Sequence, residues 1–154
     1  MQVQLESPDQ PEVIQLIAEL DAYQRQLYPP ESVYALSLEA LMAPHVLFAV
    51  ARDPAGRALG CGAIVLGSDF GELKRLYVHP RARGQGLAAR LLALLEARAA
   101  AAGCHDLMLE TGPYQTEALA FYARSGYQRR GPFGDYAEDP YSVFMHKRLA
   151  PSAA

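Results

Sequence analysis

The chain has 154 residues, of which 51% are hydrophobic and 20% charged, and its formal net charge is −3. This size and composition predict one folded domain with a substantial core, and the mild acidity excludes a general nucleic-acid-binding surface. The basic residues gather instead between residues 79 and 90, which suits a small polyanion better than a duplex. We expect the domain to span residues 1–150 and a disordered tail to follow at 151–154.

The cysteine content and the lack of a signal-peptide or membrane-spanning pattern indicate the cellular compartment of the protein. Cys61 and Cys104 are the two cysteines of the chain, and their spacing predicts no disulfide framework, redox pair or zinc site. His45, His79, His105 and His146 are widely spaced and give no metal-binding pattern. Residues 1–6 lack the pattern of a signal peptide, and charges interrupt the apolar run at 87–102. We therefore expect a cytoplasmic protein with no metal and no membrane partner.

The predicted elements follow one another in a mixed α+β order. Val3 and Leu5 alternate with polar neighbours as in a strand, and Pro11 begins a helix that ends before Pro29-Pro30. The remaining expected helices cover residues 36–42, 87–102 and 117–125, and the remaining strands cover 46–51, 59–66, 72–78, 105–110 and 142–149. A further short strand is expected near Tyr127. The order β-α-α-β-β-β-α-β-α-β predicts an antiparallel first half and one parallel pair made by a crossover helix.

A basic turn rich in glycine precedes the helix at 87–102. It reads Arg81-Ala82-Arg83-Gly84-Gln85-Gly86-Leu87-Ala88. The two glycines allow the backbone to approach a ligand, and the following helix directs its free N–H groups and positive dipole end to the same place. Arg81 and Arg83 add guanidinium groups, which suit phosphate geometry. The turn therefore predicts a site for a phosphate-bearing ligand.

Two other interpretations of this turn stay open at this point. Gly84-x-Gly86-x-x-Ala89 resembles the fingerprint of dinucleotide-binding folds, and Glu110 lies about where a ribose-binding acid is expected. Against this, hairpins precede the strand before the motif, and the turn begins with a proline and two arginines. The glycines would also be explained by a tight turn without any ligand.

The strand, the sequence Arg81-x-x-Gly84-x-Gly86 and the helix together resemble the acetyl-CoA signature of the GNAT superfamily of N-acetyltransferases. A second motif supports the resemblance, because Gln115-x-x-Ala118, Phe121-Tyr122 and Gly126-Tyr127 are similar to the family's Asn-x-x-Ala, Tyr and Gly-Phe. Gln115 replaces the usual Asn and Tyr127 the usual Phe. The resemblance covers nearly the whole chain and implies the three-layer α/β/α fold of that superfamily.

The resemblance implies how acetyl-CoA would be held. Backbone groups of Leu76, Tyr77 and Val78 are expected to bind the pantetheine arm, and an N–H of Leu76 or Tyr77 would point at the thioester oxygen. The turn would bind the pyrophosphate through its backbone amides. Beyond these residues, the predicted cofactor-binding set comprises Arg81, Arg83, Gly84, Gln85, Gly86, Leu87, Ala88 and Gln115. Family habit also makes a homodimer plausible.

Two residues are expected to carry the chemistry. Glu72 matches the position of the carboxylate base in some family members, although a surface ion pair with Lys74 or Arg75, or a base replaced by a water chain, stays open. Tyr122 matches the tyrosine beside the cofactor sulfur, where a phenol protonates the leaving thiolate, and the alternative is a core tyrosine. Direct transfer is favoured over a covalent route through Cys104, since free cysteines are usually buried apolar groups.

The acceptor is expected on the side of the sheet opposite the cofactor. A loop at residues 131–141 contains the acids Asp135, Glu138 and Asp139 among the aromatic residues Phe133, Tyr136 and Tyr141. This loop either attracts a cationic amine or is a solvated loop anchored by its aromatic rings. Residues 28–32 form the expected opposite wall. We expect the acceptor to be a small-molecule or peptide amine; a small amine or amino-acid derivative, a peptide N-terminus and a protein lysine all stay open. The competing function is a non-catalytic CoA-binding regulatory domain.

Overall fold

The computed structural model describes residues 1–33 and 36–150, so the tail expected at 151–154 lies outside the described residues. Within that part of the chain, seven strands form one sheet, accompanied by four α-helices and two 3₁₀ helices. The strands are β1 (Gln2–Leu5), β2 (Val46–Arg52), β3 (Ala58–Leu66), β4 (Gly71–Val78), β5 (Asp106–Thr111), β6 (Gln128–Arg130) and β7 (Val143–Arg148). The helices are α1 (Pro11–Leu27), η1 (Pro30–Ser32), α2 (Leu38–Leu41), η2 (Pro80–Ala82), α3 (Leu87–Ala101) and α4 (Thr116–Arg124).

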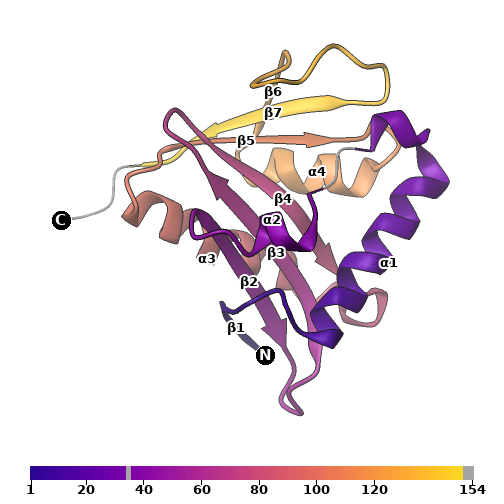
Figure 1. The fold of residues 1–154 in the computed structure, drawn as a ribbon, viewed down its shortest axis with the longest axis vertical. Coiled ribbons are helices and arrows are strands. Elements are labelled where there is room, and N and C mark those ends of the chain that lie inside the picture. Colours follow the sequence, from indigo (N-terminus) through magenta and orange to yellow (C-terminus); the bar gives the residue numbers. More distant parts are fainter. Residues whose placement is uncertain (34–35, 151–154) are drawn as a thin grey trace.

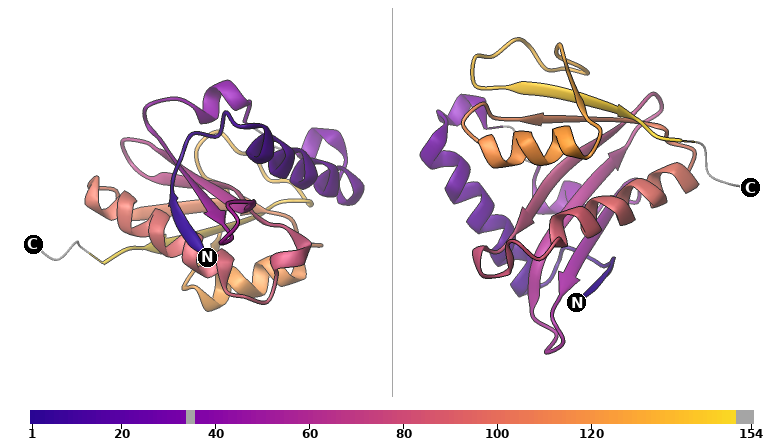
Figure 2. Two further views of the ribbon diagram at one scale, coloured as in Figure 1. Left: turned by 90° about the horizontal axis from the view of Figure 1, so that it is seen from below. Right: turned by 180° about the vertical axis from the view of Figure 1, so that it is seen from behind.

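The sheet is mixed, as the element order predicts. Its strand order is β1-β2-β3-β4-β5-β7-β6, and every neighbouring pair is antiparallel except the parallel pair β4–β5. Helices α1 and α2 cover one face in Figure 1, and α3 and α4 cover the other, as the view from behind in Figure 2 shows. The predicted three-layer α/β/α arrangement and the mixed sheet are therefore confirmed.

The element boundaries follow from local sequence signals. Pro11 occupies the first turn of α1, as expected for a residue without a backbone N–H. The second helix begins later than residues 36–42 suggested, because the Ser37 hydroxyl caps it by accepting from the Ala40 N–H at 3.1 Å. The strand expected near Tyr127 is present as β6. The other predicted boundaries agree with the structure to within one or two residues.

Alternation along the central strands divides the core between the two faces. On β2, Phe48 and Val50 pack with Val13 of α1, whereas Ala49 and Ala51 belong to the cluster that includes Leu91 of α3. Such period-2 alternation buries both faces of a strand that lies between two helical layers. A third cluster, made by Met108, Phe133 and Phe144, lies beneath the loop before β7.

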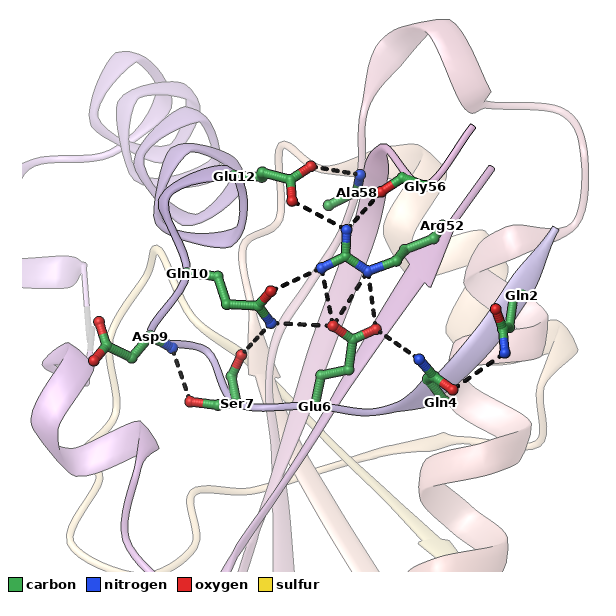
Figure 3. A network of polar contacts seen from close by, with 10 residues as sticks. All are labelled: Gln2, Gln4, Glu6, Ser7, Asp9, Gln10, Glu12, Arg52, Gly56 and Ala58. Atoms are coloured by element: carbon green, nitrogen blue, oxygen red, sulfur yellow. Dashed lines mark hydrogen bonds and ion pairs between the residues drawn. The ribbon is translucent and has the colours of Figure 1, made fainter. Parts of the chain in front are cut away.

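A polar network fixes the N-terminal segment to the β2–β3 hairpin (Figure 3). The Arg52 guanidinium donates to Glu6 through Nη2 at 2.9 Å and to Glu12 through Nη1 at 3.1 Å. It also donates to the Gln10 side chain at 2.9 Å, and Glu12 accepts from the Ala58 N–H at 3.2 Å. One arginine therefore joins β2 to the chain that enters α1.

The same arginine controls the ionisation of Glu6. Hydrogen bonds from Arg52 lower the pKa of the Glu6 carboxyl from 4.5 to about 2, against the opposing effect of burial. Because the folded-state pKa lies below the unfolded-state value, the ionised pair stabilises the fold above pH 4.5. This contribution is lost as the pH falls towards the folded-state pKa.

We expect Glu6→Gln to lower the free energy of unfolding near pH 7 by about 1–3 kcal/mol, since the neutral amide loses the charge-assisted bonds to Arg52. Urea unfolding followed by circular dichroism between pH 7 and pH 2 measures the difference from the wild type. The difference should shrink as the pH falls and disappear near pH 2. Glu39→Gln, at an exposed glutamate of α2, is the control with little effect. A pH-independent loss would show that packing, and not charge, explains the effect.

Candidate active site

The site begins where β4 and β5 separate. Among the described residues, their ladder comprises the pairs Gly71–Leu107, Glu72–Met108 and Leu73–Leu109 and then ends, although both strands continue. A bulge accompanies the separation, because Cys61 of β3 lies opposite Tyr77 while Ala63 lies opposite Lys74. Arg75 in this bulge has a left-handed φ of 61°. Figure 1 shows β4 and β5 diverging from this point, which leaves the inner edge of β4 unpaired with β5.

A groove of about 850 Å³ opens on the α3 and α4 side of this separation. It is bounded by the end of β4, the glycine turn, the start of α3, one side of α4 with the loop before it, and Leu20 and Tyr23 of α1. Of the predicted cofactor-binding residues it brings together Leu76, Tyr77, Val78, Arg83, Gly84, Gly86, Leu87, Ala88 and Gln115. Arg81 and Gln85 belong to the same turn but do not line the groove. The groove is thus lined by both β4 and the glycine turn, the two segments predicted from the sequence to hold the same ligand.

The glycines of the turn are required by backbone conformation. Gly84 and Gly86 have φ values of 80° and 75°, which L-residues rarely adopt, and Gly86 is the N-cap of α3. A Cβ at either position would meet no protein atom within 4 Å. The close approach of a ligand is the reason expected from the sequence for these glycines, and the left-handed backbone is a second reason.

Arg83 is turned towards the protein. Its Nε donates to the Val78 carbonyl at 3.1 Å, and its guanidinium lies 5.8 Å from the centre of the Tyr77 ring. The guanidinium is therefore engaged at the end of β4, and the turn presents the α3 N-terminus and backbone amides to the groove. Arg81 is exposed, and its backbone N–H donates to His79 Nδ1 at 3.1 Å.

A second, smaller cavity of about 90 Å³ lies at the same separation. We call it the acceptor-side cavity; its walls come from α1, η1, β4, β5 and the segment before β7. It shares with the groove the residues Leu20, Leu76, Gln115, Ala118 and Tyr122. The groove and the cavity are therefore neighbours across one wall, and Glu72 lines only the cavity.

Tyr122 belongs to both the groove and the core. Its side chain is 9% exposed, and its ring meets the Tyr127 ring edge-on at 5.8 Å. Burial raises the pKa of the Tyr122 phenol well above its usual value, so the hydroxyl stays protonated and able to donate. The core packing anticipated as an alternative is present, and it places the phenol in the wall between the two spaces.

Glu72 is half-buried and engaged by two neighbours. The Tyr136 hydroxyl donates to its Oε2 at 2.6 Å, and Lys74 Nζ lies 3.2 Å from the same oxygen. The pairing with Lys74 that the sequence analysis considered is thus present. Pairing with Arg75 is not, because the Arg75 guanidinium binds Asp21.

Glu110 is the carboxylate that sequence reasoning missed. It is the first residue of β5 beyond the last pair with β4, and it lines the acceptor-side cavity. Burial raises the pKa of its carboxyl from 4.5 to about 7; Ser142 and Lys74 oppose this shift, while Glu72 and Asp139 add to it. The available signal was an acid placed directly after the apolar run Leu107–Leu109, where it was considered only as a ribose ligand.

The segment before β7 closes the acceptor-side cavity. Phe133 and Tyr136 anchor it to the core, whereas Asp135 and Glu138 are exposed. The Ser32 hydroxyl donates to Asp139 Oδ2 at 2.8 Å, so η1 and this segment meet. The loop is thus anchored by its aromatic rings, and Tyr141 is its aromatic residue that lines the cavity.

Tyr28 provides the opposite wall, as expected for residues 28–32. Its ring stacks on Tyr114 with centres 5.6 Å apart and meets Tyr141 edge-on at 6.2 Å. The Tyr28 hydroxyl accepts from the Tyr114 N–H at 3.1 Å. It occupies the place where a Cβ of residue 112 would lie, 1.8 Å away, so Gly112 is needed for this contact.

The described residues offer neither a metal-binding cluster nor a membrane-spanning helix. Within residues 1–33 and 36–150, no group of three or more His, Cys, Asp or Glu side chains is arranged to hold a metal ion. No helix in that part of the chain is long and apolar enough to cross a membrane.

The mixed sheet with one splayed parallel pair, the glycine turn and the helix N-terminus at the groove agree with the acyl-CoA-dependent transferase class that the sequence resemblance implied. Residues 13–127 match the Acetyltransferase (GNAT) family, and the chain belongs to this family of N-acetyltransferases. It is 49% identical to the IAA acetyltransferase of Azospirillum brasilense, over 94% of this chain and 95% of that protein. It is 36% identical to the uncharacterized N-acetyltransferase YsnE of Bacillus subtilis, over 90% and 93% of the two chains.

Solved structures agree with this family. A Klebsiella pneumoniae protein described as an acyl-CoA N-acyltransferase superposes with a TM-score of 0.82 at 45% identity, covering 97% of each chain. An aminoglycoside 6'-N-acetyltransferase complexed with coenzyme A has a TM-score of 0.73 over the full length of both chains. Its 18% identity shows a shared fold. The dinucleotide interpretation of the turn has no support in these comparisons.

Proposed function

We propose that the protein transfers an acetyl group from acetyl-CoA directly to a primary amine. The observation that carries this proposal is the shared wall between the groove and the acceptor-side cavity, which contains Leu76 and Tyr122. A donor in the groove and an amine in the cavity would meet at this wall without a covalent enzyme intermediate. Burial raises the pKa of Cys61 to about 12 and also raises that of Cys104, so neither thiol is a ready nucleophile.

The groove supplies the contacts that the donor needs. The α3 N-terminus and the backbone amides of the glycine turn suit the pyrophosphate, and the unpaired edge of β4 suits the amide groups of the pantetheine arm. A backbone N–H of Leu76 or Tyr77 would stabilise the negative charge that develops on the thioester oxygen. Gln115, whose Oε1 accepts from the Gly112 N–H at 3.3 Å, orders the loop that enters α4 beside the groove.

Three proton transfers complete the reaction. The acceptor enters as an ammonium ion with a pKa of about 10 and must lose a proton before its nitrogen attacks the thioester carbon. We propose that Glu110 accepts this proton, because its carboxyl lies in the cavity and burial raises its pKa to about 7. Glu72, the base predicted from the sequence, is the second candidate in the same cavity. As the C–S bond breaks, the Tyr122 phenol protonates the leaving thiolate. The attacking nitrogen then gives up its second proton, which restores the Tyr122 phenol, and the products are the N-acetylated amine and free coenzyme A, with the first proton released from the base to solvent.

A non-catalytic CoA-binding domain is the competing function. Such a domain would need the glycine turn but neither the buried acid in the cavity nor the phenol in the shared wall. Both groups are in place, which favours the enzyme. Thiol release measured over a panel of amines separates the two functions.

We expect acetyl-CoA to raise the melting temperature of the protein, because a ligand at about a hundred times its Kd contributes about 2.7 kcal/mol. Gly84→Glu and Gly86→Glu should abolish this shift, since each places a carboxylate at the anion site on a left-handed backbone. Gly56→Glu is the matched control: φ is 84° there too, but the position lies in the β2–β3 hairpin. No shift with millimolar acetyl-CoA for the wild type would remove the proposed donor.

If Glu110 is the base, kcat/KM should rise with pH through about 7, since only the ionised carboxylate accepts a proton. Glu110→Gln should remove this limb of the pH profile and lower kcat/KM by about 10²–10⁴-fold. Glu72→Gln is the comparison, with a smaller loss and the limb retained. The acceptor amine also loses its proton as the pH rises, but this contribution to the pH profile is the same for the wild type, Glu110→Gln and Glu72→Gln. Loss of the limb in Glu72→Gln alone would transfer the role to Glu72.

Tyr122→Phe should lower kcat by roughly 10²-fold or more while leaving the acetyl-CoA-induced thermal shift unchanged, because the variant keeps the ring and loses only the acidic hydroxyl. Tyr127→Phe is the control in the neighbouring ring; it removes the 2.9 Å bond to Glu96 and should affect stability but not kcat. Equal kcat values for the wild type and Tyr122→Phe would contradict the role of Tyr122 as the acid.

A further inference from the structure

Lys74 lies across from the proposed base at the point where the β4–β5 ladder ends. Glu72 is paired with Met108 in that ladder, so Lys74, two residues later on the same face of β4, has Glu110 as its counterpart on β5. Both side chains line the acceptor-side cavity. An ion pair between them would lower the pKa of the Glu110 carboxyl and weaken it as a base.

The ammonium group of Lys74 is instead held by Glu72 and Tyr136. Lys74 Nζ lies 3.2 Å from Glu72 Oε2 and donates to the Tyr136 hydroxyl at 3.0 Å. That hydroxyl donates to the same Glu72 oxygen at 2.6 Å, which closes a triangle of contacts. Among the described residues, no ion pair joins Lys74 to Glu110.

Tyr136 is itself fixed by the core, so its hydroxyl has a defined position. Its ring centre lies 5.1 Å from that of Phe133 and 5.4 Å from that of Phe144. Lys74 Nζ lies 5.7 Å from the centre of the Tyr136 ring, and the lysine side chain is 14% exposed. The lysine is therefore held mostly out of water by groups that do not belong to β5.

Lys74 is also the cation whose position decides how basic Glu110 is. Arg75, the other cation that lines the cavity, is already paired with Asp21. The remaining titratable or polar groups around Glu110 carry no positive charge and come from the end of α1, from α4 and from the segment before β7: Tyr28, Tyr122, Asp139, Tyr141 and Ser142.

We propose that Lys74 is a positioning residue, whose ammonium group Glu72 and Tyr136 hold apart from Glu110. Glu110 is then free to take the proton of the acceptor amine, and Glu72 acts through Lys74 without taking that proton itself. This inference rests on the proposed acetyl transfer with Glu110 as the base, and it gives the acid predicted from the sequence a different role.

The test follows the titration of the Glu110 carboxyl by carbon-13 NMR in protein labelled at its glutamate side chains, with Glu110→Gln identifying the signal. Glu72→Gln removes the ion-pair partner of Lys74 and a negative charge near Glu110, so the titration should move to lower pH by about one pH unit or more. Lys74→Met should move it to higher pH, because a positive charge near the carboxyl is lost.

The double variant separates holding of the lysine from a simple change of charge. If Glu72 keeps Lys74 apart, Lys74→Met should shift the titration further in the Glu72→Gln background than in the wild type, because only there is the lysine released. Equal shifts in the two backgrounds would overturn the proposal. Tyr136→Phe keeps both charges and should still move the titration to lower pH; an unchanged titration would overturn the role of Tyr136.

A second cluster of the same composition provides the matched control. Lys147 Nζ and the Tyr127 hydroxyl each donate to Glu96 at 2.9 Å, and Nζ lies 5.7 Å from the centre of the Tyr127 ring. This cluster lines neither the groove nor the acceptor-side cavity. Glu96→Gln should therefore leave the Glu110 titration unchanged, whereas a shift as large as that of Glu72→Gln would overturn the proposal.

The pH profile of kcat/KM shows whether the held lysine matters for catalysis. Its rising limb should move with the Glu110 titration in each variant, and a dispersed amide spectrum verifies that the variant is folded. A limb that stays in place while the titration moves would overturn the catalytic role of Lys74 and leave acetyl transfer intact. If no amine releases thiol, the proposed function fails, and the NMR titration still decides whether Lys74 is held.

Discussion

Parallel strands are held together by evenly spaced backbone hydrogen bonds, and β4 and β5 give up these bonds after three residue pairs. The backbone groups released on β4 would be costly if they were simply buried, so they need a partner from outside the sheet. The bulge at Arg75, the groove beside α3 and the acceptor-side cavity all lie at this separation. The position of the site is therefore set by the point at which the β4–β5 ladder ends.

Because side chains alternate along a strand, the proposed base and the proposed acid lie on different faces of the sheet. Leu107 and Leu109 of β5 pack in the cluster with α3 and α4, whereas Met108 packs beneath the loop before β7. Glu110 follows Met108 by two residues and shares its face, and Tyr122 approaches from α4 on the other. The proposed base and acid thus reach the reacting atoms from opposite sides, which suits a reaction that removes one proton and supplies another.

Local signals were enough to predict most of the fold, because prolines, glycines and apolar periodicity act over a few residues. They also predicted most of the residues that line the groove, because the turn and the helix that follows are contiguous in sequence. The acceptor side depends on contacts between distant segments, such as Ser32 with Asp139 and Glu72 with Tyr136. Glu110 looked like an ordinary strand residue, since its raised pKa comes from burial that only the assembled sheet creates. The left-handed Arg75 carries no sequence signal, because its conformation is imposed by the bulge.

Mechanically, the sheet consists of two leaves. One leaf is β1–β4 with antiparallel ladders, and the other is β5, β7 and β6, in which β5 shares six residue pairs with β7 but only three with β4. The seam between the leaves is therefore held by only three residue pairs, and the groove lies beside it. Two side-chain hydrogen bonds, Ser32–Asp139 and Glu72–Tyr136, connect segments on opposite sides of the seam next to the acceptor-side cavity. Because every other ladder lies within one leaf or the other, the width of the groove depends on the angle between the leaves and not on the pairing within them.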